Sequence, residues 1–192
     1  DDFKFLGVLS NAVKKMREGE ITQLKKSKSL DIDEETYFKI ISDKTASLFS
    51  SCCKMGAIST NSKAKNIDLM SEFGLLVGKA FQIRDDLFGY LSYDTGKPSL
   101  NDFKQAKITL PLIHSLSKVN NRKQKEIITN LKNFKSIDKV ISFVKENGGI
   151  DYSEKIMSNL IERSYNILNQ FPESKYKNSL QNLLDYTIRR EL

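Results

Sequence analysis

Two adjacent carboxylates, Asp85 and Asp86, are the side chains with the clearest chemical potential in this sequence of 192 residues. They lie in a predicted helix that is apolar around most of its circumference, which is typical of a buried helix. An unpaired buried carboxylate is costly and two adjacent ones repel each other, so we expect a cation, most naturally a metal ion, to meet them. The apolar positions of this helix form two adjoining faces: Leu69, Phe73, Leu76, Ala80, Ile83 and Leu87, and Met70, Val77, Phe81 and Phe88.

The spacing of the polar residues on this helix suits a hard divalent cation. Gln82, Asp85, Asp86 and position 89 follow an i, i+3, i+4, i+7 pattern and share one side of the helix. Such oxygen donors can hold Mg²⁺, whose coordination is usually completed by water and by phosphate oxygens. The pattern predicts a magnesium–diphosphate site, although paired aspartates also occur on solvated helix faces and in salt bridges. The cations available to neutralise the remaining phosphate charge are Lys44, Lys97 and Lys107.

A lysine in an apolar stripe is the second chemical signal. Lys44 lies midway along a predicted helix over residues 34–58, with Thr45 beside it. The lysine either extends to the rim of the stripe or meets an anion, to which the threonine hydroxyl could add a hydrogen bond. The predicted stripe consists of Tyr37, Ile41, Lys44, Leu48, Cys52 and Met55.

The elements that position these residues are all predicted to be helices. Asp33 is a predicted N-cap for the helix that begins at residue 34. Gly74 and Gly78 are four residues apart and permit another helix to approach closely. Gly19 indicates either close packing, a nearby ligand or a tolerated weak point in the first helix. The expected helices cover residues 5–26, 34–58, 123–132, 137–146, 152–169 and 175–190, together with a long helix that starts at residue 66 or 68 and runs to about 90. An irregular loop follows near 92–103, and residues 108–113 begin a further helix with Pro111 in its first turn. Because no strand pattern is present, we expect an all-α, multi-helix bundle forming a single domain over residues 1–192.

Composition narrows the class of protein. The net charge is +7, but the lysines are spread along the chain without a nucleic-acid-binding signature, so no nucleic-acid partner is expected. The basic surface is either solvated or directed to an anionic substrate or an anionic membrane. One histidine, His114, excludes a cluster of histidines around zinc. No apolar run reaches the length of a transmembrane helix. Adjacent Cys52 and Cys53 cannot readily form a disulfide with each other, and reduced, core-filling thiols favour a cytoplasmic protein.

Several short motifs together resemble the C-terminal part of a trans-type polyprenyl (isoprenyl) diphosphate synthase. Their order and spacing both agree with that family over essentially the whole chain. The resemblance implies an all-α isoprenoid synthase fold from which the N-terminal helices are missing. The motifs are Gly19-Glu20…Gln23, Lys44-Thr45-Ala46, Phe81-Gln82-Ile83-Arg84-Asp85-Asp86, Gly96-Lys97-Pro98…Asp102 and Lys107-Ile108-Thr109-Leu110-Pro111-Leu112.

The resemblance also implies a reaction and its cofactor. Mg²⁺ would bind the diphosphate of an allylic substrate, which ionises to an allylic cation. The double bond of isopentenyl diphosphate then attacks this cation, and a proton is lost. By motif position, the magnesium ligands would be Asp85 and, through water, Asp86. The substrate-binding residues would be Lys44, Thr45, Gln82, Lys97 and Lys107, and Asp102 would support them. Three of these, Lys44, Thr45 and Gln82, would also be the catalytic residues. The family commonly forms homodimers.

Two departures from the family pattern open an alternative. The family's Asp-Asp-x-x-Asp motif ends here in Gly89, which removes a carboxylate that Asp94 could replace from the loop. An earlier aspartate-rich motif of the family is absent, so we expect either a fragment or a chain that cannot bind the full magnesium cluster alone. The alternative is a catalytically weak or inactive prenyl-synthase-like subunit that regulates or supports a partner. A generic helical interaction protein without a ligand is a third hypothesis.

Overall fold

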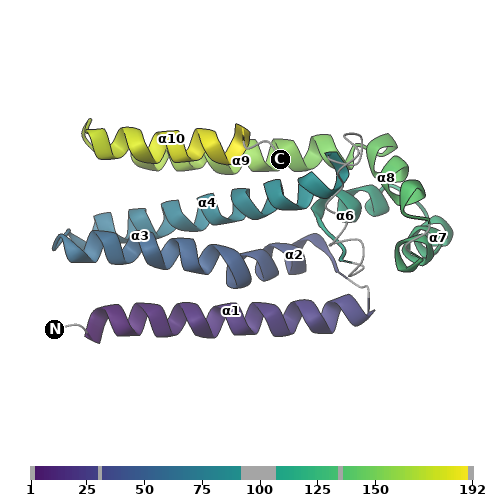
Figure 1. The fold of residues 1–192 in the computed structure, drawn as a ribbon, viewed down its shortest axis with the longest axis horizontal. Helices are drawn as coiled ribbons and strands as arrows, with labels where there is room; N and C mark the ends of the chain where they lie inside the picture. The colour runs from purple at the N-terminus through teal and green to yellow at the C-terminus, as the bar shows by residue number, and fades with distance from the viewer. Residues whose placement is uncertain (1–2, 30–31, 92–106, 134–135, 190–192) are drawn as a thin grey trace. The chain divides into compact units, whose positions relative to one another are not determined.

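A computed structural model describes residues 3–29, 32–91, 107–133 and 136–189 of the chain (Figure 1). Throughout these ranges the regular structure is helical and contains no strand, which confirms the predicted all-α class. The helices are α1 (Phe3–Ser29), α2 (Glu34–Ile41), a π-helix η1 (Ser42–Ala46), α3 (Ser47–Ser59), α4 (Ala64–Leu91), α6 (Leu110–Ser117), α7 (Asn121–Lys132), α8 (Ile137–Glu146), α9 (Gly149–Leu168) and α10 (Lys175–Arg189).

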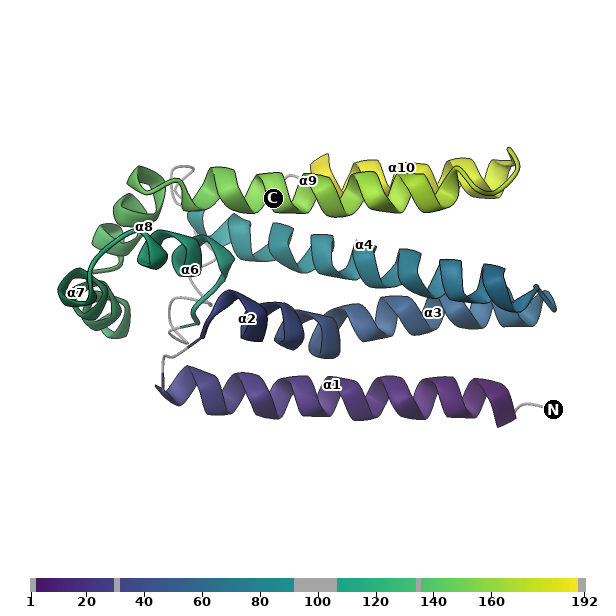
Figure 2. The same ribbon diagram turned by 180° about the vertical axis from the view of Figure 1, so that it is seen from behind.

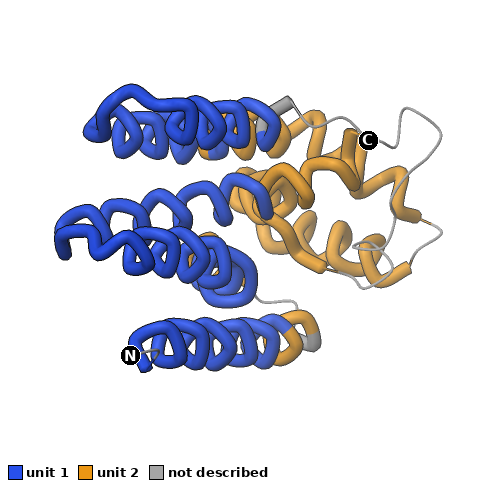
Figure 3. Tube along the Cα trace, turned by 60° about the vertical axis from the view of Figure 1, so that its left-hand side comes forward, with its two compact units in different colours: residues 1–23, 38–82, 157–191 blue, residues 24–37, 83–156, 192 orange. Residues whose placement is uncertain are grey.

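The chain divides into two compact units, shown in different colours in Figure 3. Unit 1 comprises residues 1–23, 38–82 and 157–191, and unit 2 comprises residues 24–37, 83–156 and 192. The long helices α1, α4 and α9 each contribute residues to both units. The expectation of one domain over residues 1–192 stays a prediction.

Unit 1 is built from long helices that lie side by side in both ribbon views (Figures 1 and 2). The contact of α4 with η1 and α3 is very close because two glycines of α4 face it. A Cβ atom on Gly74 would lie 2.5 Å from the carbonyl oxygen of Phe49, and one on Gly78 would lie 2.6 Å from the Cα of Ala46. The predicted close approach of a helix at these two glycines is therefore confirmed.

Unit 2 contains the short helices α6, α7 and α8, of which α8 packs against both α6 and α7. Pro111 lies in the first turn of α6, as the sequence predicts, because its missing N–H costs nothing there. Leu110 and Leu112 of α6 and Val140 and Val144 of α8 are completely buried. These residues form an apolar core between α6 and α8.

The segment predicted as one helix over residues 34–58 is interrupted by the π-helix η1. Its start agrees with prediction, since Asp33 accepts a hydrogen bond from the backbone N–H of Thr36 at 2.8 Å. The predicted stripe is wrong beyond η1: Tyr37 and Ile41 are buried, whereas Leu48 is 39% exposed and Cys52 is also exposed. A π-turn contains an extra residue, so it rotates every following side chain around the helix axis.

The first helix, α1, carries apolar side chains on two faces. Ala12 and Gly19 are buried on one face. The other face leaves large side chains exposed, among them Phe3 at 82%, Leu6 at 59% and Ile21 at 51%. Of the helices that the structure describes, none has both the length and the apolar character that crossing a membrane requires.

Candidate functional site

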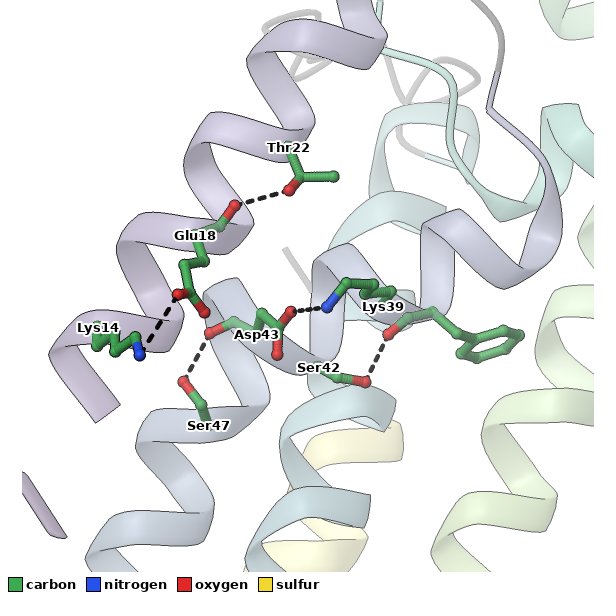
Figure 4. A network of polar contacts seen from close by, with 8 residues as sticks. Lys14, Glu18, Thr22, Lys39, Ser42, Asp43 and Ser47 are labelled. Carbon is green, nitrogen blue, oxygen red and sulfur yellow. Dashed lines mark hydrogen bonds and ion pairs between the residues drawn. The ribbon is translucent and has the colours of Figure 1, made fainter. Parts of the chain in front are cut away.

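The predicted diphosphate-binding residues Lys44 and Thr45 lie on η1, in unit 1. Single π-turns within α-helices frequently mark functional sites. Hydroxyl groups reinforce the backbone on both sides of this one: Ser42 donates to the carbonyl oxygen of Phe38, and Ser47 donates to that of Asp43 at 2.6 Å (Figure 4). The π-turn is thus a stabilised part of the fold rather than a frayed junction between two helices.

The ammonium group of Lys44 is held by two side chains of α1. Its Nζ lies 2.8 Å from Oε2 of Glu20 and donates a hydrogen bond of 2.6 Å to Oε1 of Gln23. Helix α1 can approach η1 this closely because residue 19 is glycine: a Cβ there would lie 2.6 Å from the backbone nitrogen of Lys44. The Lys44 side chain remains 34% exposed, so its positive charge is fixed in place yet accessible to a ligand.

Thr45 and Gln82 meet across the contact between η1 and α4. The Thr45 hydroxyl donates to Oε1 of Gln82 at 2.7 Å, although the two residues are 37 positions apart in the sequence. Gln82 is the last residue of α4 that belongs to unit 1. Unit 1 therefore holds Thr45 against Gln82 of α4, and it holds the preceding residue, Lys44, against Glu20 and Gln23 of α1.

The aspartate pair follows on the next turn of α4, within unit 2. Asp86 is buried, with 6% of its surface exposed, and Asp85 is half-buried. Oδ2 of Asp86 accepts a hydrogen bond of 2.7 Å from the hydroxyl of Tyr37, which is 4% exposed. Gly89, where the family pattern has a third aspartate, is also buried.

The oxygen donors of this pair fit Mg²⁺, which prefers carboxylate and water ligands. Within the described ranges no group of three or more His, Cys, Asp or Glu side chains is placed to hold one metal ion. Two protein carboxylates supplemented by phosphate oxygens nevertheless match the usual way in which proteins bind Mg²⁺.

The other predicted site residues lie after α4 in the sequence. Lys107 is half-buried in unit 2 and lies shortly before α6. Lys97, Asp94 and Asp102 fall in residues 92–106, outside the described residues.

Sequence reasoning assigned no role to three residues that contact the site: Glu20, Gln23 and Tyr37. Glu20 and Gln23 had a detectable signal, since they are three residues apart and follow Gly19 directly. Tyr37 had none beyond its place in the apolar stripe, because nothing local connects it with Asp86.

Known proteins resemble this chain over nearly its whole length. It is 29% identical over 192 residues to the geranylfarnesyl diphosphate synthase of Aeropyrum pernix, which covers 98% of this chain and 60% of that protein. It is 27% identical over 186 residues to heptaprenyl diphosphate synthase component 2 of Bacillus subtilis, covering 96% of this chain and 53% of that protein.

A solved structure shows the same similarity in three dimensions. The polyprenyl synthase of Caulobacter crescentus, crystallised with calcium and isoprenyl diphosphate, matches with a TM-score of 0.87 at 26% identity. The match covers 98% of this chain and 60% of that protein. The chain thus spans between about half and three fifths of the length of these relatives.

A family model matches the chain as well. The model described as polyprenyl synthetase matches residues 1–146, which include every residue of the candidate site. The matched relatives and the helical fold agree with it. The chain belongs to the polyprenyl synthetase family.

Proposed function

We propose that the full-length protein is a prenyltransferase that condenses an allylic diphosphate with isopentenyl diphosphate to form a longer polyprenyl diphosphate. The observation that carries this proposal is that two consecutive residues of η1 are held in place, Lys44 by Glu20 and Gln23, and Thr45 by Gln82. The relatives that the chain matches are named as polyprenyl diphosphate synthases, such as the geranylfarnesyl diphosphate synthase of Aeropyrum pernix. Lys44 offers a fixed positive charge to a diphosphate. The oxygens of Thr45 and Gln82 offer lone pairs to a positively charged carbon.

The residues that would hold Mg²⁺ are Asp85 and Asp86. When bound, Mg²⁺ would neutralise the diphosphate leaving group and so favour cleavage of the allylic C–O bond. Lys44, with Lys97 and Lys107, would neutralise the charge that remains on the diphosphate. Electrostatic stabilisation of this kind requires donors and charges that are already in place before the reaction. The contacts of Lys44 with Glu20 and Gln23 meet that requirement.

The chemical step makes one carbon–carbon bond and releases one proton. Loss of diphosphate leaves an allylic cation, the double bond of isopentenyl diphosphate attacks it, and a proton leaves the product cation. Thr45 and Gln82 are suited to stabilise the cation because their polar oxygens are already oriented by a mutual hydrogen bond of 2.7 Å. Apolar walls would exclude water that could otherwise capture the cation.

The test uses the full-length protein with Mg²⁺, an allylic diphosphate and radiolabelled isopentenyl diphosphate, with extraction and chromatography of the product. Wild-type protein should give a longer prenyl chain, and Asp85→Ala should abolish it. The matched control is Asp68→Ala, which removes an exposed aspartate from the same helix and should retain full activity. Undiminished product formation by Asp85→Ala would refute the role of that carboxylate.

A second candidate function is a subunit that supports a catalytic partner. Two observations favour it: position 89 carries no carboxylate, and one relative is named as component 2 of its synthase. Gly89→Asp distinguishes the two functions. A large gain in rate indicates an enzyme weakened at its metal site, whereas no catalysis before or after the substitution indicates a supporting subunit.

We further propose that two copies associate through the exposed face of α1. An apolar face of this extent usually marks an interaction surface, and a two-fold interface must be self-complementary. Antiparallel pairing about the midpoint between Val13 and Lys14 would match Phe3 with Leu24 and Leu6 with Ile21, which are all exposed.

We also propose a cytoplasmic location. Cys52 and Cys53 are both free thiols. Free cysteines are more common in reducing compartments, where disulfides rarely persist.

A further inference from the structure

A buried hydrogen bond joins the aspartate pair of α4 to a tyrosine at the start of α2. The Tyr37 hydroxyl donates to Oδ2 of Asp86 at 2.7 Å, and both residues belong to unit 2. The two side chains are almost completely removed from solvent, at 4% and 6% exposure. A hydrogen bond from a hydroxyl to a carboxylate is short and about twice as strong as one between neutral groups.

The position of the Tyr37 ring is set by the start of its helix. Asp33 caps α2 through the backbone N–H of Thr36, and its carbonyl oxygen accepts the backbone N–H of Tyr37 at 2.9 Å. Both backbone contacts involve the first turn of α2. Tyr37 therefore reaches Asp86 from an anchored backbone, which is what a residue that orients another side chain requires.

Packing alone does not account for the hydroxyl group. A phenylalanine would fill the same apolar position at residue 37, and it would leave a buried carboxylate with one donor fewer. Asp86 also follows Asp85 directly, so the two negative charges repel each other. A donor on Asp86 offsets part of the cost of burying this carboxylate beside a second one.

We propose that Tyr37 is a positioning residue of the metal site: its hydroxyl fixes the rotation of the Asp86 carboxylate so that the Asp85–Asp86 pair is presented to a magnesium-bound diphosphate in one orientation. This inference rests on the proposed function. Mg²⁺ demands nearly ideal octahedral geometry, so it is sensitive to the orientation of its carboxylates. Residues that orient metal ligands typically change metal affinity or activity by about 10- to 100-fold when substituted. Because Gly89 supplies no third carboxylate, the orientation of the remaining two matters more.

The chain offers a matched control on α4 itself. Tyr90 is also buried, at 2% exposure, and its hydroxyl forms a hydrogen bond of 3.2 Å with the Thr109 hydroxyl. Tyr37→Phe and Tyr90→Phe therefore each remove one buried hydroxyl from unit 2. Tyr37→Phe removes a donor from Asp86, whereas Tyr90→Phe removes the hydrogen-bond partner of the Thr109 hydroxyl.

The experiment measures Mg²⁺ binding by calorimetry in the presence of methylene diphosphonate, a diphosphate mimic that cannot react, using the full-length protein. Tyr37→Phe should weaken Mg²⁺ binding by about 10-fold, whereas Tyr90→Phe should bind as the wild type does. In an Asp86→Asn background the effect of Tyr37→Phe should disappear, because the carboxylate that it orients is gone. Unchanged binding by Tyr37→Phe, equal weakening by Tyr90→Phe, or the same effect in the Asp86→Asn background would each overturn the inference.

Circular dichroism shows whether Tyr37→Phe is folded. If the variant is unfolded, the experiment uses a protein with 3-fluorotyrosine at position 37 instead. This residue keeps the ring and the hydroxyl but makes the hydroxyl a stronger hydrogen-bond donor. A changed Mg²⁺ affinity then supports the inference, and an unchanged one overturns it. These experiments measure Mg²⁺ binding and not product formation, so they can fail or succeed independently of the test of the proposed function. Weakened binding by Tyr37→Phe in a protein that makes no prenyl product would reject the reaction and keep the positioning role.

Discussion

Gly19 and Lys44 lie so close together that a Cβ atom on Gly19 would be 2.6 Å from the backbone nitrogen of Lys44. Real Cβ contacts are essentially never shorter than 3.0 Å, so a side chain here must displace either α1 or η1. The contact decides where the Lys44 ammonium lies relative to Glu20 and Gln23. It therefore connects helix packing directly to the candidate site.

Gly19→Ala should destabilise the protein by about 1–3 kcal/mol, the usual cost of overpacking, and should lower the affinity for the allylic diphosphate. Chemical denaturation and the KM for that substrate measure the two effects. The control is Gly7→Ala on the same helix, where a Cβ would meet no atom within 4 Å. That variant should be neutral or more stable by up to about 1 kcal/mol, because alanine has the higher helix propensity. Equal effects of both substitutions would contradict the packing argument.

Lys44→Gln should raise the KM for the allylic diphosphate by about 10- to 100-fold, since a charge-assisted hydrogen bond contributes about 1.5–3 kcal/mol. The dependence of KM on salt concentration should also become weaker. Lys14→Gln is a suitable control because Lys14 is an exposed lysine of α1, 3.9 Å from Glu18. A KM for Lys44→Gln that matches the control would show that the diphosphate binds elsewhere.

Thr45 and Gln82 should act as a pair. Thr45→Val removes the hydroxyl that donates to Gln82, so it should lower kcat, while Thr45→Ser should restore most of it. A double-mutant cycle with Gln82→Leu should give a coupling energy of about 1 kcal/mol in transition-state stabilisation. Thr129→Val, whose exposed hydroxyl bonds to the Lys125 carbonyl, provides the control and should not change kcat. Strictly additive effects would indicate that the hydrogen bond has no role in turnover.

His114 should make stability depend on pH. Burial, and then the positive charge of Lys118, lower the pKa of His114 below 6.5, while Glu34 acts in the opposite direction. The ring also stacks on Tyr152 with centroids 3.9 Å apart. Below pH 6.5 the unfolded state binds more protons at this residue than the folded state does, so stability should fall as pH falls through the window between the two pKa values.

Denaturant titrations of the full-length protein between pH 7.5 and pH 5 measure this effect. The loss of stability should be smaller in His114→Phe, which keeps a stacking ring but cannot take up a proton. The contribution of His114 is fully present above pH 6.5. An identical pH dependence in wild type and His114→Phe would mean that other groups cause it.

Leu6→Glu should disrupt association of two copies through the exposed face of α1, because it places a charge within the apolar pairing. Analytical ultracentrifugation should show a dimer for the wild type and a monomer for the variant. Leu183→Glu introduces the same charge on α10, where Leu183 is 43% exposed, and should remain dimeric. A monomeric wild type or a dimeric Leu6→Glu variant would show that two copies do not associate through this face of α1.

Local patterns in the sequence predicted most of the helical architecture. The bounds of α8, Ile137–Glu146, agree with the expected range, and Asp33 caps α2 as expected. Gly74 and Gly78 indicated a close helix contact, which the structure contains. Helical periodicity and capping depend on residues within a few positions of one another, and a pair of glycines four residues apart marks a possible close approach without naming the partner helix.

The identity of the partners across helices was decided only by the tertiary structure. Thr45 meets Gln82 from 37 positions away, and Tyr37 meets Asp86 from 49 positions away. Such contacts depend on how each helix is rotated about its own axis. The π-turn at Ser42–Ala46 changes that rotation for all the residues that follow it, which is why the stripe predicted through Leu48 and Cys52 was wrong. The sequence alone identified the candidate residues for the chemistry, and only helix packing decided which side chains hold them in position.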